Sequence, residues 1–396
     1  MDNRNRPLAL AGLAAAGLAL LAAGCGGEPQ PAATADVGSA AASAGPAKVK
    51  LAYLGLTCEA AMFVAQEQGF FKEEGLDVEF VKTDWDGLRD GLGLGKFDAN
   101  YTLIMYLLKP IEQGLDVKIT GGVHSGCLRT QVPEGSPVKS LADLKGKTIG
   151  IPNMGSPPFL FTSRALAAQG LDPQKDVNWV VVAPEIMKIA LEKGQVDAVA
   201  NSEPMGSILT AQAKVRTVAD QAVDEPYRDE YCCATVVSGK LAASDPAKAA
   251  KVTRALLKGA LWVETNPKAA ADMAVEKKYV ASSAELNAHA LGKLKFMPGV
   301  AGCRDSIGLA AKEMKTAGLL NPSTDPAELA KRAWIDLEGV DDGWIKGLKV
   351  EQVAGGGRAP ALDDARLAEL VGREKDLHAL CCLGCDMPAD SDLCGR

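Results

Sequence analysis

Short apolar stretches alternate with amphipathic ones along the first part of the chain. The strand-like stretches are KVKLAYLG (48–55), LDVEFVK (76–82), DANYTLI (98–104) and DVKITGGV (116–123). Between the first two, EAAMFVAQEQGFF (59–71) places Ala60, Phe63, Val64 and Phe70 near one face of a predicted amphipathic helix. Weaker helical patterns cover 86–97 and 105–114. Strands that alternate with helices predict an α/β fold with a mainly parallel sheet, covered by helices on both faces.

A second alternating series follows. Its predicted strands lie at the end of 140–153 and within 176–183, 196–204 and 215–220, with helices at 156–170 and 185–194. Ser156 as N-cap and Pro157 in the first turn mark the start of the first of these helices. After an extended run at 231–241, predicted helices cover 245–265, 267–278, 283–292, 304–318 and 325–337. The whole pattern predicts two α/β lobes and a returning helical segment. A ligand would bind where loops gather beyond the carboxyl ends of the strands.

The N-terminus has the pattern of an export signal that ends at a lipidated cysteine. Arg4 and Arg6 precede an apolar run (8–24) that is too short and too rich in Ala and Gly for a good membrane span. The ending LLAAGC resembles a bacterial lipobox with Cys25 as the lipidated residue, although Ala22 stands where Leu is preferred. The alternative is an ordinary cleaved signal with a chance cysteine. We expect a signal peptide at 1–24 and a lipid-anchored protein in the periplasm or another extracytoplasmic space.

The segment after the signal is rich in Gly, Pro, Ala and Ser and has almost no large apolar side chain. Because such a segment cannot bury enough surface to offset its ordering entropy, we expect a flexible tether at 25–47. The lipid would then be the only contact with the membrane. The formal net charge of -7 argues against nucleic acid as a partner and says little about a small ligand.

Four segments, in order along the chain, resemble a known family. They are AQEQGFFKEEGLDVEFV (65–81), SLADLKGKTIGIPNMGSP (140–157), AAQGLDPQKDVNWV (167–180) and ALEKGQVDAVANSEP (190–204). These are similar to the periplasmic substrate-binding proteins of ABC importers. The subgroup is the one for nitrate, sulfonate, taurine and thiamine-pyrimidine uptake (the NMT1/THI5-like group), and the resemblance covers roughly residues 48–335.

The resemblance implies a type II periplasmic-binding fold, in which two lobes joined by two crossover strands close on one small ligand. It places the crossovers near 128–134 and 231–238, lobe 1 at 48–129 plus 237–340, and lobe 2 at 130–236. A linker, a helix and a Cys-rich tail would occupy 341–396. The implied protein is a monomeric, non-enzymatic solute-binding component that delivers its ligand to ABC permease subunits in the inner membrane. The implied cargo is a nitrate, sulfonate or pyrimidine-type small molecule.

Cargo contacts are implied in the strand-end loops of both lobes. The candidate residues are Thr57, Cys58, Trp85, Tyr101, His124, Cys127, Gly155, Ser156, Glu203 and Cys232. Free N–H groups and the helix dipole at Gly155 and Ser156 favour an anionic or polar group, although Ser156 is equally suited to capping its own helix. Trp85 offers a flat wall or an indole N–H, and Glu203 an acceptor for a cation or a ring N–H. Tyr101 could orient a ligand through its hydroxyl. The alternatives are surface packing for Trp85, a solvated loop position for Glu203 and a partly buried sheet-end position for Tyr101.

Cysteines at loop and crossover positions depart from the usual pattern of the family. Without the lipobox residue, nine of the ten cysteines remain, and five are expected near the cleft: Cys58, Cys127, Cys232, Cys233 and Cys303. An exported protein with this many cysteines usually forms disulfides, which is one expectation for each of them. The other is a pocket of soft ligands made of Cys58, His124, Cys127 and Cys232 or Cys233, suited to Zn, Cu(I), Fe or a metalloid complex. A thiophilic or metal-containing solute is therefore a second cargo class, and a metal ion bound by cysteines is a candidate cofactor.

The resemblance does not cover the C-terminal region. After a linker (355–360) and a charged helix (362–380), the tail holds a His/Cys-rich tract: His378, Cys381, Cys382, Cys385 and Cys394. Because Cys382 and Cys385 have a metal-type spacing, the tract could hold Zn or an iron centre, or else form two disulfides. Two further functions stay open. One is a thiamine-pyrimidine synthase-like enzyme that uses iron and pyridoxal, because CCLGC resembles the CCCFC cluster of yeast relatives but lacks its middle cysteine. The other is a metal or redox module carried by the tail.

Overall fold

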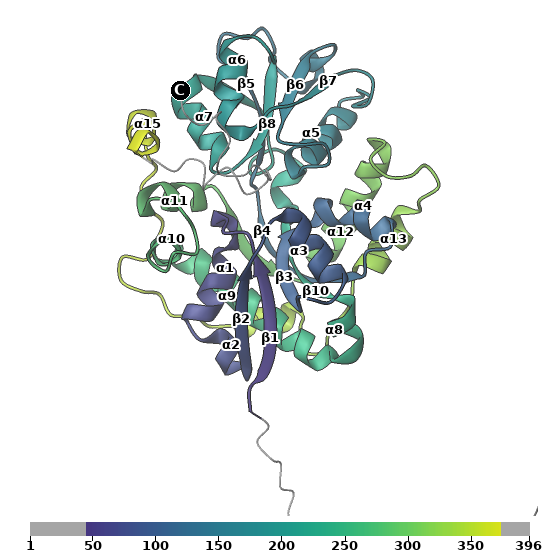
Figure 1. The fold of residues 1–396 in the computed structure, drawn as a ribbon, viewed down its shortest axis with the longest axis vertical. Helices are drawn as coiled ribbons and strands as arrows, with labels where there is room; N and C mark the ends of the chain where they lie inside the picture. The colour runs from purple at the N-terminus through teal and green to yellow at the C-terminus, as the bar shows by residue number, and fades with distance from the viewer. Residues whose placement is uncertain (1–44, 374–396) are drawn as a thin grey trace, which may run out of the picture. The chain divides into compact units, whose positions relative to one another are not determined.

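The structure is a computed structural model that describes residues 45–373. Within this range the chain forms two β-sheets with helices packed against them (Figure 1). The first sheet has the strand order β11-β4-β10-β3-β1-β2, and the second has the order β7-β6-β8-β5-β9. We call the parts of the chain around these sheets lobe 1 and lobe 2. The predicted α/β fold with two sheet-centred lobes is confirmed.

The strands of each lobe come from separate parts of the sequence. Lobe 1 contains β1 (Ala47–Tyr53), β2 (Leu76–Lys82), β3 (Ala99–Leu103), β4 (Val117–Ser125), β10 (Cys233–Ser238) and β11 (Lys295–Gly299). Lobe 2 contains β5 (Leu128–Pro133), β6 (Thr148–Ile151), β7 (Asn178–Val181), β8 (Ala198–Ser202) and β9 (Val215–Asp220). The chain passes between the sheets at 126–127, directly after β4, and again at 221–232, directly before β10.

Both sheets are mixed rather than mainly parallel. β1 pairs in parallel with β2 and β3, and β6 does so with β7 and β8, as the strand–helix alternation predicts. The strands next to the two passages run the other way: β10 is antiparallel to β3 and β4, and β5 is antiparallel to β8 and β9. A strand that enters a sheet from the other lobe has no crossover helix before it, so its direction is not set by the βαβ rule.

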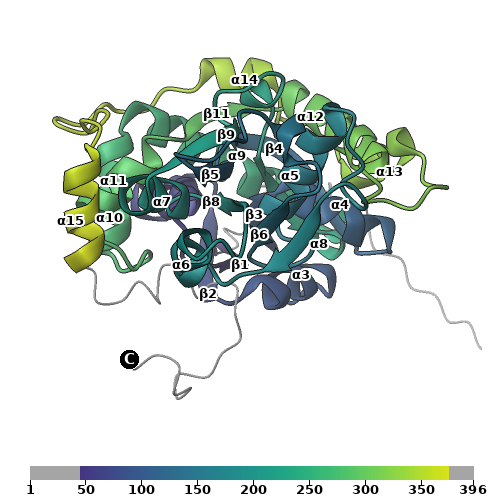
Figure 2. The ribbon, with the colours of Figure 1, turned by 90° about the horizontal axis from the view of Figure 1, so that it is seen from above.

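Helices cover the faces of both sheets. Lobe 1 carries η1 (Thr57–Glu59), α1 (Ala60–Glu67), α2 (Phe70–Glu73), α3 (Trp85–Gly93), α4 (Ile104–Glu112), α8 (Gly239–Ser244), α9 (Pro246–Thr265), α10 (Pro267–Glu276), α11 (Ala284–Leu291), α12 (Ala301–Thr316), α13 (Pro326–Ala333) and α14 (Asp342–Gly347). Lobe 2 carries η2 (Leu141–Leu144), α5 (Pro157–Ala168), η3 (Pro184–Ile186), α6 (Met187–Glu192) and α7 (Met205–Ala213). Viewed from above, α5 and α7 lie on opposite sides of β8 (Figure 2), and both contact it. A further short helix, η4 (Tyr227–Asp229), lies in the second passage.

Local signals in the sequence explain where several helices begin. Asp245 precedes Pro246 and accepts a hydrogen bond from Lys248 N at 2.9 Å, so α9 has both an N-cap and a proline in its first turn. Asp84 caps α3 in the same way, through Gly87 N at 2.6 Å. The predicted helices between 245 and 337 are confirmed as α9 to α13, with ends that differ by a few residues.

Two predicted elements differ from the structure. The extended run at 231–241 ends at Ser238, whose hydroxyl oxygen accepts a hydrogen bond from Leu241 N and starts α8. The edge strand β11 was not predicted, because KFMPG contains a proline and a glycine and shows no apolar alternation. No helix within residues 45–373 is both long and apolar enough to span a bilayer. The last described helix, α15 (Asp364–Arg373), contacts α7 and α11.

Candidate functional site

A cavity of about 630 Å³ is bounded by loops of both lobes. Lobe 1 contributes the segments that follow β1, β2 and β3, and lobe 2 contributes those that follow β6, β7 and β8. These are the carboxyl ends of strands, where ligands of open α/β sheets bind. The volume lies within the range of about 300–1,000 Å³ that is usual for small-molecule sites.

The predicted contact residues divide into two groups. The residues that line the cavity are Cys58, Trp85, Cys127, Gly155, Ser156 and Glu203. Those that do not line it are Thr57, Tyr101, His124 and Cys232, which are all buried in the protein. Thr57 is held away from the cavity by a hydrogen bond from its hydroxyl to Asn287 Oδ1 at 2.6 Å. Tyr101 and His124 lie in β3 and β4, where strand register directs them into the core, and Cys232 lies directly before β10.

Ser156 lines the cavity, and its hydroxyl has no hydrogen-bond partner among residues 45–373. Ser156 is 5% exposed and precedes α5, yet its side chain makes no capping hydrogen bond. A buried polar group that stays unpaired costs about 1–3 kcal/mol, so a polar atom of a ligand would be a favourable partner. Pro157 and Pro158 have no N–H, so this helix end offers fewer donors to an anion than its position suggests. The hydroxyl is therefore the main polar feature that α5 presents.

An aromatic wall and two cations occupy another part of the cavity. Trp85 from α3 and Tyr106 from α4 pack edge to face with ring centroids 5.2 Å apart. Arg89 and Lys109 also line the cavity. Arg89 is already paired with Asp86 at 2.8 Å, and Lys109 has a carboxylate partner on its own helix. This part combines apolar surface with charge that is largely neutralised within the protein.

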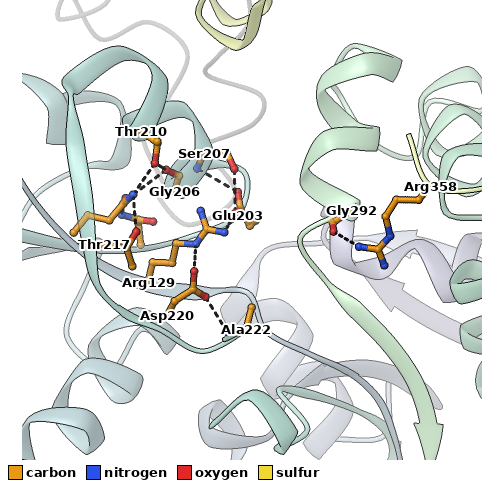
Figure 3. Close-up of polar contacts among 12 residues, drawn as sticks. Arg129, Glu203, Gly206, Ser207, Thr210, Thr217, Asp220, Ala222, Gly292 and Arg358 are labelled. Atoms are coloured by element: carbon orange, nitrogen blue, oxygen red, sulfur yellow. Dashed lines mark hydrogen bonds and ion pairs between the residues drawn. The ribbon is translucent and has the colours of Figure 1, made fainter. Parts of the chain in front are cut away.

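Glu203 is tied to an arginine that the sequence interpretation did not single out. Arg129 Nη2 lies 2.7 Å from Glu203 Oε1, and Arg129 Nε lies 2.9 Å from Asp220 Oδ2 (Figure 3). Ser207 Oγ donates a further hydrogen bond to Glu203 at 3.1 Å. The pKa of Glu203 lies above its usual value, because burial raises it by more than the Arg129 guanidinium lowers it. A cationic ligand would have to compete with Arg129, so Glu203 is less suited to a cation than its loop position predicts.

Four free thiols form a continuous row at the hinge side of the cavity. Electrostatic interactions couple Cys58 to Cys233, Cys233 to Cys232, and Cys232 to Cys127. The two end members, Cys58 and Cys127, line the cavity, and the two middle members stand behind them. All five cysteines among residues 45–373 are free, so none of the expected disulfides is present there. Cys303 is a buried residue of α12. It does not line the cavity, although the sequence placed it near the cleft.

The row of thiols alternates between acidic and weakly acidic members. The hydrogen bond from Cys233 lowers the pKa of the Cys58 thiol to about 6, although burial raises it. Hydrogen bonds from Cys127 and Cys233 likewise lower the pKa of Cys232. The pKa values of Cys127 and Cys233 lie above the usual value, because interaction with Cys232 and burial raise both of them. Cys58 and Cys232 are therefore the members that lose a proton first, and the thiolate is the reactive and metal-binding form of cysteine.

His124 stands beside this row. It is paired with Cys233 across β4 and β10, and its carbonyl oxygen accepts the Cys232 N–H at 2.9 Å. Its Nδ1 lies 3.3 Å from the Ser125 carbonyl oxygen, which can only accept, so Nδ1 carries the proton in the neutral ring. Nε2 is buried and has no nitrogen or oxygen partner. Burial lowers the pKa of His124, but Cys58 and Cys232 raise it by more, so the pKa lies above its usual value.

The backbone at the first passage is strained. Cys127 has a φ of 127°, a region that residues with a side chain rarely adopt. Such a conformation costs on the order of 1–3 kcal/mol and persists only where the surroundings enforce it. Here Gly126 before it also has a positive φ, and the Cys127 carbonyl oxygen accepts a hydrogen bond from Glu203 N at 3.0 Å. The strain holds a thiol at the cavity wall in the segment that joins the lobes.

The described residues do not form a closed metal cage. In the range 45–373, no group of three or more His, Cys, Asp or Glu side chains is arranged to hold a metal ion. This excludes from that range the tetrahedral cluster that is usual for structural zinc. The predicted lipidation site Cys25 and the predicted tail ligands lie outside the described residues: His378, Cys381, Cys382, Cys385 and Cys394.

Three methionines that the sequence interpretation did not single out also line the cavity. They are Met105, Met154 and Met205. Met154 and Met205 lie within or directly after the loops NMGSPP and NSEP, so their place next to candidate contacts was a usable signal. The sulfur of Met105 already has a partner, because it accepts a hydrogen bond from Arg164 Nη1 at 3.0 Å. Together with Cys58 and Cys127, the methionines give the cavity an unusually sulfur-rich lining.

Comparison with known proteins adds relatives to this geometry. The nitrate/nitrite binding protein NrtA of Nostoc sp. is 26% identical over 293 residues, which is 65% of this chain and 61% of that protein. The nitrate import ATP-binding protein NrtC of Synechocystis sp. is 28% identical over 182 residues, or 41% of this chain and 27% of that protein. The chain thus spans less than two thirds of the length of these relatives.

Solved structures confirm the fold. The alkanesulfonate-binding protein SsuA of Xanthomonas axonopodis pv. citri, bound to MOPS, superposes with a TM-score of 0.58 at 20% identity. The match covers 74% of this chain and 99% of that one. The model of the NMT1-like family matches residues 42–276, which is more than half of the chain and includes most of the cavity-lining segments. The chain therefore belongs to the NMT1-like family.

Proposed function

We propose that this protein is the solute-binding component of an ABC importer and captures one small molecule between its two lobes. The observation that carries the proposal is the cavity, whose wall is built from strand-end loops of both lobes. Within residues 45–373, the two sheets are joined at 126–127 and 221–232, and α15 also contacts α7 of lobe 2 and α11 of lobe 1. A ligand that touches both lobes favours the closed arrangement over the open one, which is the signal that a permease can detect.

Several features support this role. The family match and the relatives named for nitrate binding and nitrate import point to uptake of small solutes. The export signal, the lipobox at Cys25 and the Gly/Pro-rich tether favour an extracytoplasmic, lipid-anchored protein. In that setting the partners are the permease subunits of the importer, and the protein acts as a monomer without enzymatic activity.

The cavity favours a cargo larger than an inorganic anion. Its volume of about 630 Å³ has room for an organic molecule with an apolar body, which would pack against Trp85 and Tyr106. A polar group on the same molecule would meet the unpaired Ser156 hydroxyl. The structural neighbour that holds MOPS, an organic sulfonate, has the same fold and so accommodates a molecule of this size.

The proposal is tested by native mass spectrometry of the protein isolated from its own cell envelope. The wild-type protein should carry one small molecule per chain. Met154→Trp, which fills the cavity from an exposed position, should lose the molecule. Val181→Trp places the same side chain at a similarly exposed site of lobe 2 that does not line the cavity, and should retain it. A wild-type protein without a bound molecule, or a molecule that survives Met154→Trp, would contradict the proposal.

A further inference from the structure

The sulfur atoms of the cavity come from both lobes and from the hinge between them. Cys58 follows β1, Cys127 lies in the first passage, and Met154 and Met205 follow β6 and β8. Both cysteines are free thiols, so their sulfur atoms are available to a ligand. Closure of the lobes would change the distances among these four atoms, which makes the sulfur set part of the moving site.

Each cavity thiol has a second thiol directly behind it. Cys58 interacts most strongly with Cys233, and Cys127 interacts with Cys232. The middle cysteines are each 1% exposed, and neither lines the cavity. The arrangement therefore offers pairs of sulfur ligands, each with one member at the cavity wall.

A buried imidazole stands beside Cys58 and interacts with its thiol. Nε2 of His124 has no nitrogen or oxygen partner, although the residue is fully buried. Because Nδ1 is oriented by the Ser125 carbonyl oxygen, Nε2 is the nitrogen left for the interaction with Cys58. Ser156, at the cavity wall, likewise has a hydroxyl without a partner. Ser156 lines the cavity, whereas His124 does not and would act on a ligand only through Cys58.

We infer that the cargo of the proposed site carries a soft metal ion, of which Cu(I) is the natural probe, and that Cys58 and Cys127 bind this ion. The inference rests on the proposed function, because it names the cargo class of the same cavity. Thiolates and thioethers select soft ions such as Cu(I) among the first-row metals. Cu(I) is satisfied by two thiolates, so it does not need the closed cage that is absent from residues 45–373. Zinc in a structural site would need such a cage.

The size of the cavity decides between a bare ion and a complex. A volume of about 630 Å³ is far larger than one ion, and much of the wall is aromatic and apolar, including Trp85, Tyr106 and Phe159. The ion would therefore arrive with a small organic ligand that packs on these rings while the thiols replace part of its coordination. An importer also needs a site that releases its cargo, and two sulfur ligands at the cavity wall release an ion more readily than a tetrahedral cage.

The test is anaerobic competition for Cu(I) between bicinchoninic acid and the reduced full-length protein. Wild type should bind one more Cu(I) per chain than Cys58→Ser/Cys127→Ser, since other thiols of the chain contribute equally to both proteins. Cys303→Ser removes a buried free thiol that does not line the cavity, and should match wild type. Cys233→Ser removes only the thiol behind Cys58 and should weaken binding about 10–100-fold. Equal Cu(I) stoichiometry in wild type and the double variant would overturn the inference.

A second measurement needs no substitution and so does not depend on how the variants fold. Iodoacetamide labelling of wild type, mapped by peptide mass spectrometry, should show that Cu(I) protects Cys58 and Cys127. Labelling of both at an unchanged rate would also overturn the inference. One result separates this inference from the proposed function. If a metal-free molecule from the native envelope stays bound to Cys58→Ser/Cys127→Ser, the soft-metal cargo is refuted and solute binding is not.

Discussion

Arg164 connects the two lobes through a buried cluster of charges, and its removal should be strongly destabilising. The residue lies in α5 of lobe 2 and is 1% exposed. Its Nη2 is 3.0 and 2.9 Å from the two carboxylate oxygens of Glu230, in the second passage. Nη2 and Nε lie 2.7 and 3.0 Å from Glu313 Oε2, on α12 of lobe 1. One guanidinium thus binds two carboxylates from different parts of the molecule.

The size of the effect follows from what remains after substitution. Arg164→Met keeps the length of the side chain but leaves Glu230 and the half-buried Glu313 without their cation. Breaking a buried ion pair from one side costs about 3–5 kcal/mol. Unfolding entropy of about 2.1 cal/mol/K per residue gives roughly 0.7 kcal/mol/K for a body of this size, so the melting temperature should fall by about 4–7 °C.

Differential scanning calorimetry of wild type, Arg164→Met and the triple variant Arg164→Met/Glu230→Gln/Glu313→Gln measures the effect. The triple variant removes the unpaired charges and should recover most of the lost stability, because replacing a whole buried cluster costs far less than breaking it. Burial raises the pKa of Glu230 although Arg164 lowers it, so the deficit of Arg164→Met should shrink as the pH falls and Glu230 takes up a proton. A loss below about 1 °C, or an equal loss in the triple variant, would refute this reasoning.

Three further predictions concern the wall of the cavity and the core of lobe 1. Because Cys127 has a φ of 127°, Cys127→Gly should be more stable than Cys127→Ala by about 1–2 kcal/mol in urea unfolding, and equal stabilities would argue against backbone strain. Burial, and then Cys58, raise the pKa of Glu59 to about 8, above its unfolded value, so its contribution is complete at low pH and is lost as the pH rises. Between pH 6 and 8, wild type should therefore lose about 1.4 kcal/mol per pH unit relative to Glu59→Gln, and parallel stability curves would contradict this. A Cβ at Gly259 would lie 2.2 Å from Ala61 O, so Gly259→Ala should lower the free energy of unfolding by about 1–3 kcal/mol. Gly308→Ala, in open space on α12, should raise it by about 0.5–1 kcal/mol. Equal effects of the two substitutions would show that α1 and α9 can move apart.

The local elements of the fold could be predicted because their signals are local. The strands predicted between 48 and 123 agree with β1 to β4, and the helices predicted to begin at Ser156 and Asp245 agree with α5 and α9. The direction of β10 in its sheet could not be predicted in the same way. It depends on where the chain returns from lobe 2, which is a property of the whole topology. β11 was missed because an edge strand with a proline lacks the alternation that identifies strands.

The candidate site could be predicted as a set of loops but not as a set of contacts. The loop positions of Cys58, Cys127 and Ser156 agree with the lining of the cavity, because strand ends in such folds meet at one edge. Whether a strand residue faces the cavity or the core depends on strand register, which places Tyr101 of β3 and His124 of β4 in the core. Arg129 lies in β5 and Glu203 directly follows β8, and these two strands are neighbours in the sheet but far apart in sequence. No local sequence pattern therefore predicts this ion pair.

The central claim is that a small molecule binds between the lobes, in the cavity that Cys58, Trp85 and Ser156 share. A crystal structure of the protein purified from its native cell envelope, with anomalous data at the copper edge, tests this most directly. We predict density for one organic ligand in this cavity, in contact with both lobes and with the Ser156 hydroxyl, and an anomalous peak beside Cys58 and Cys127. An empty cavity in a protein that carries its ligand elsewhere would contradict the account.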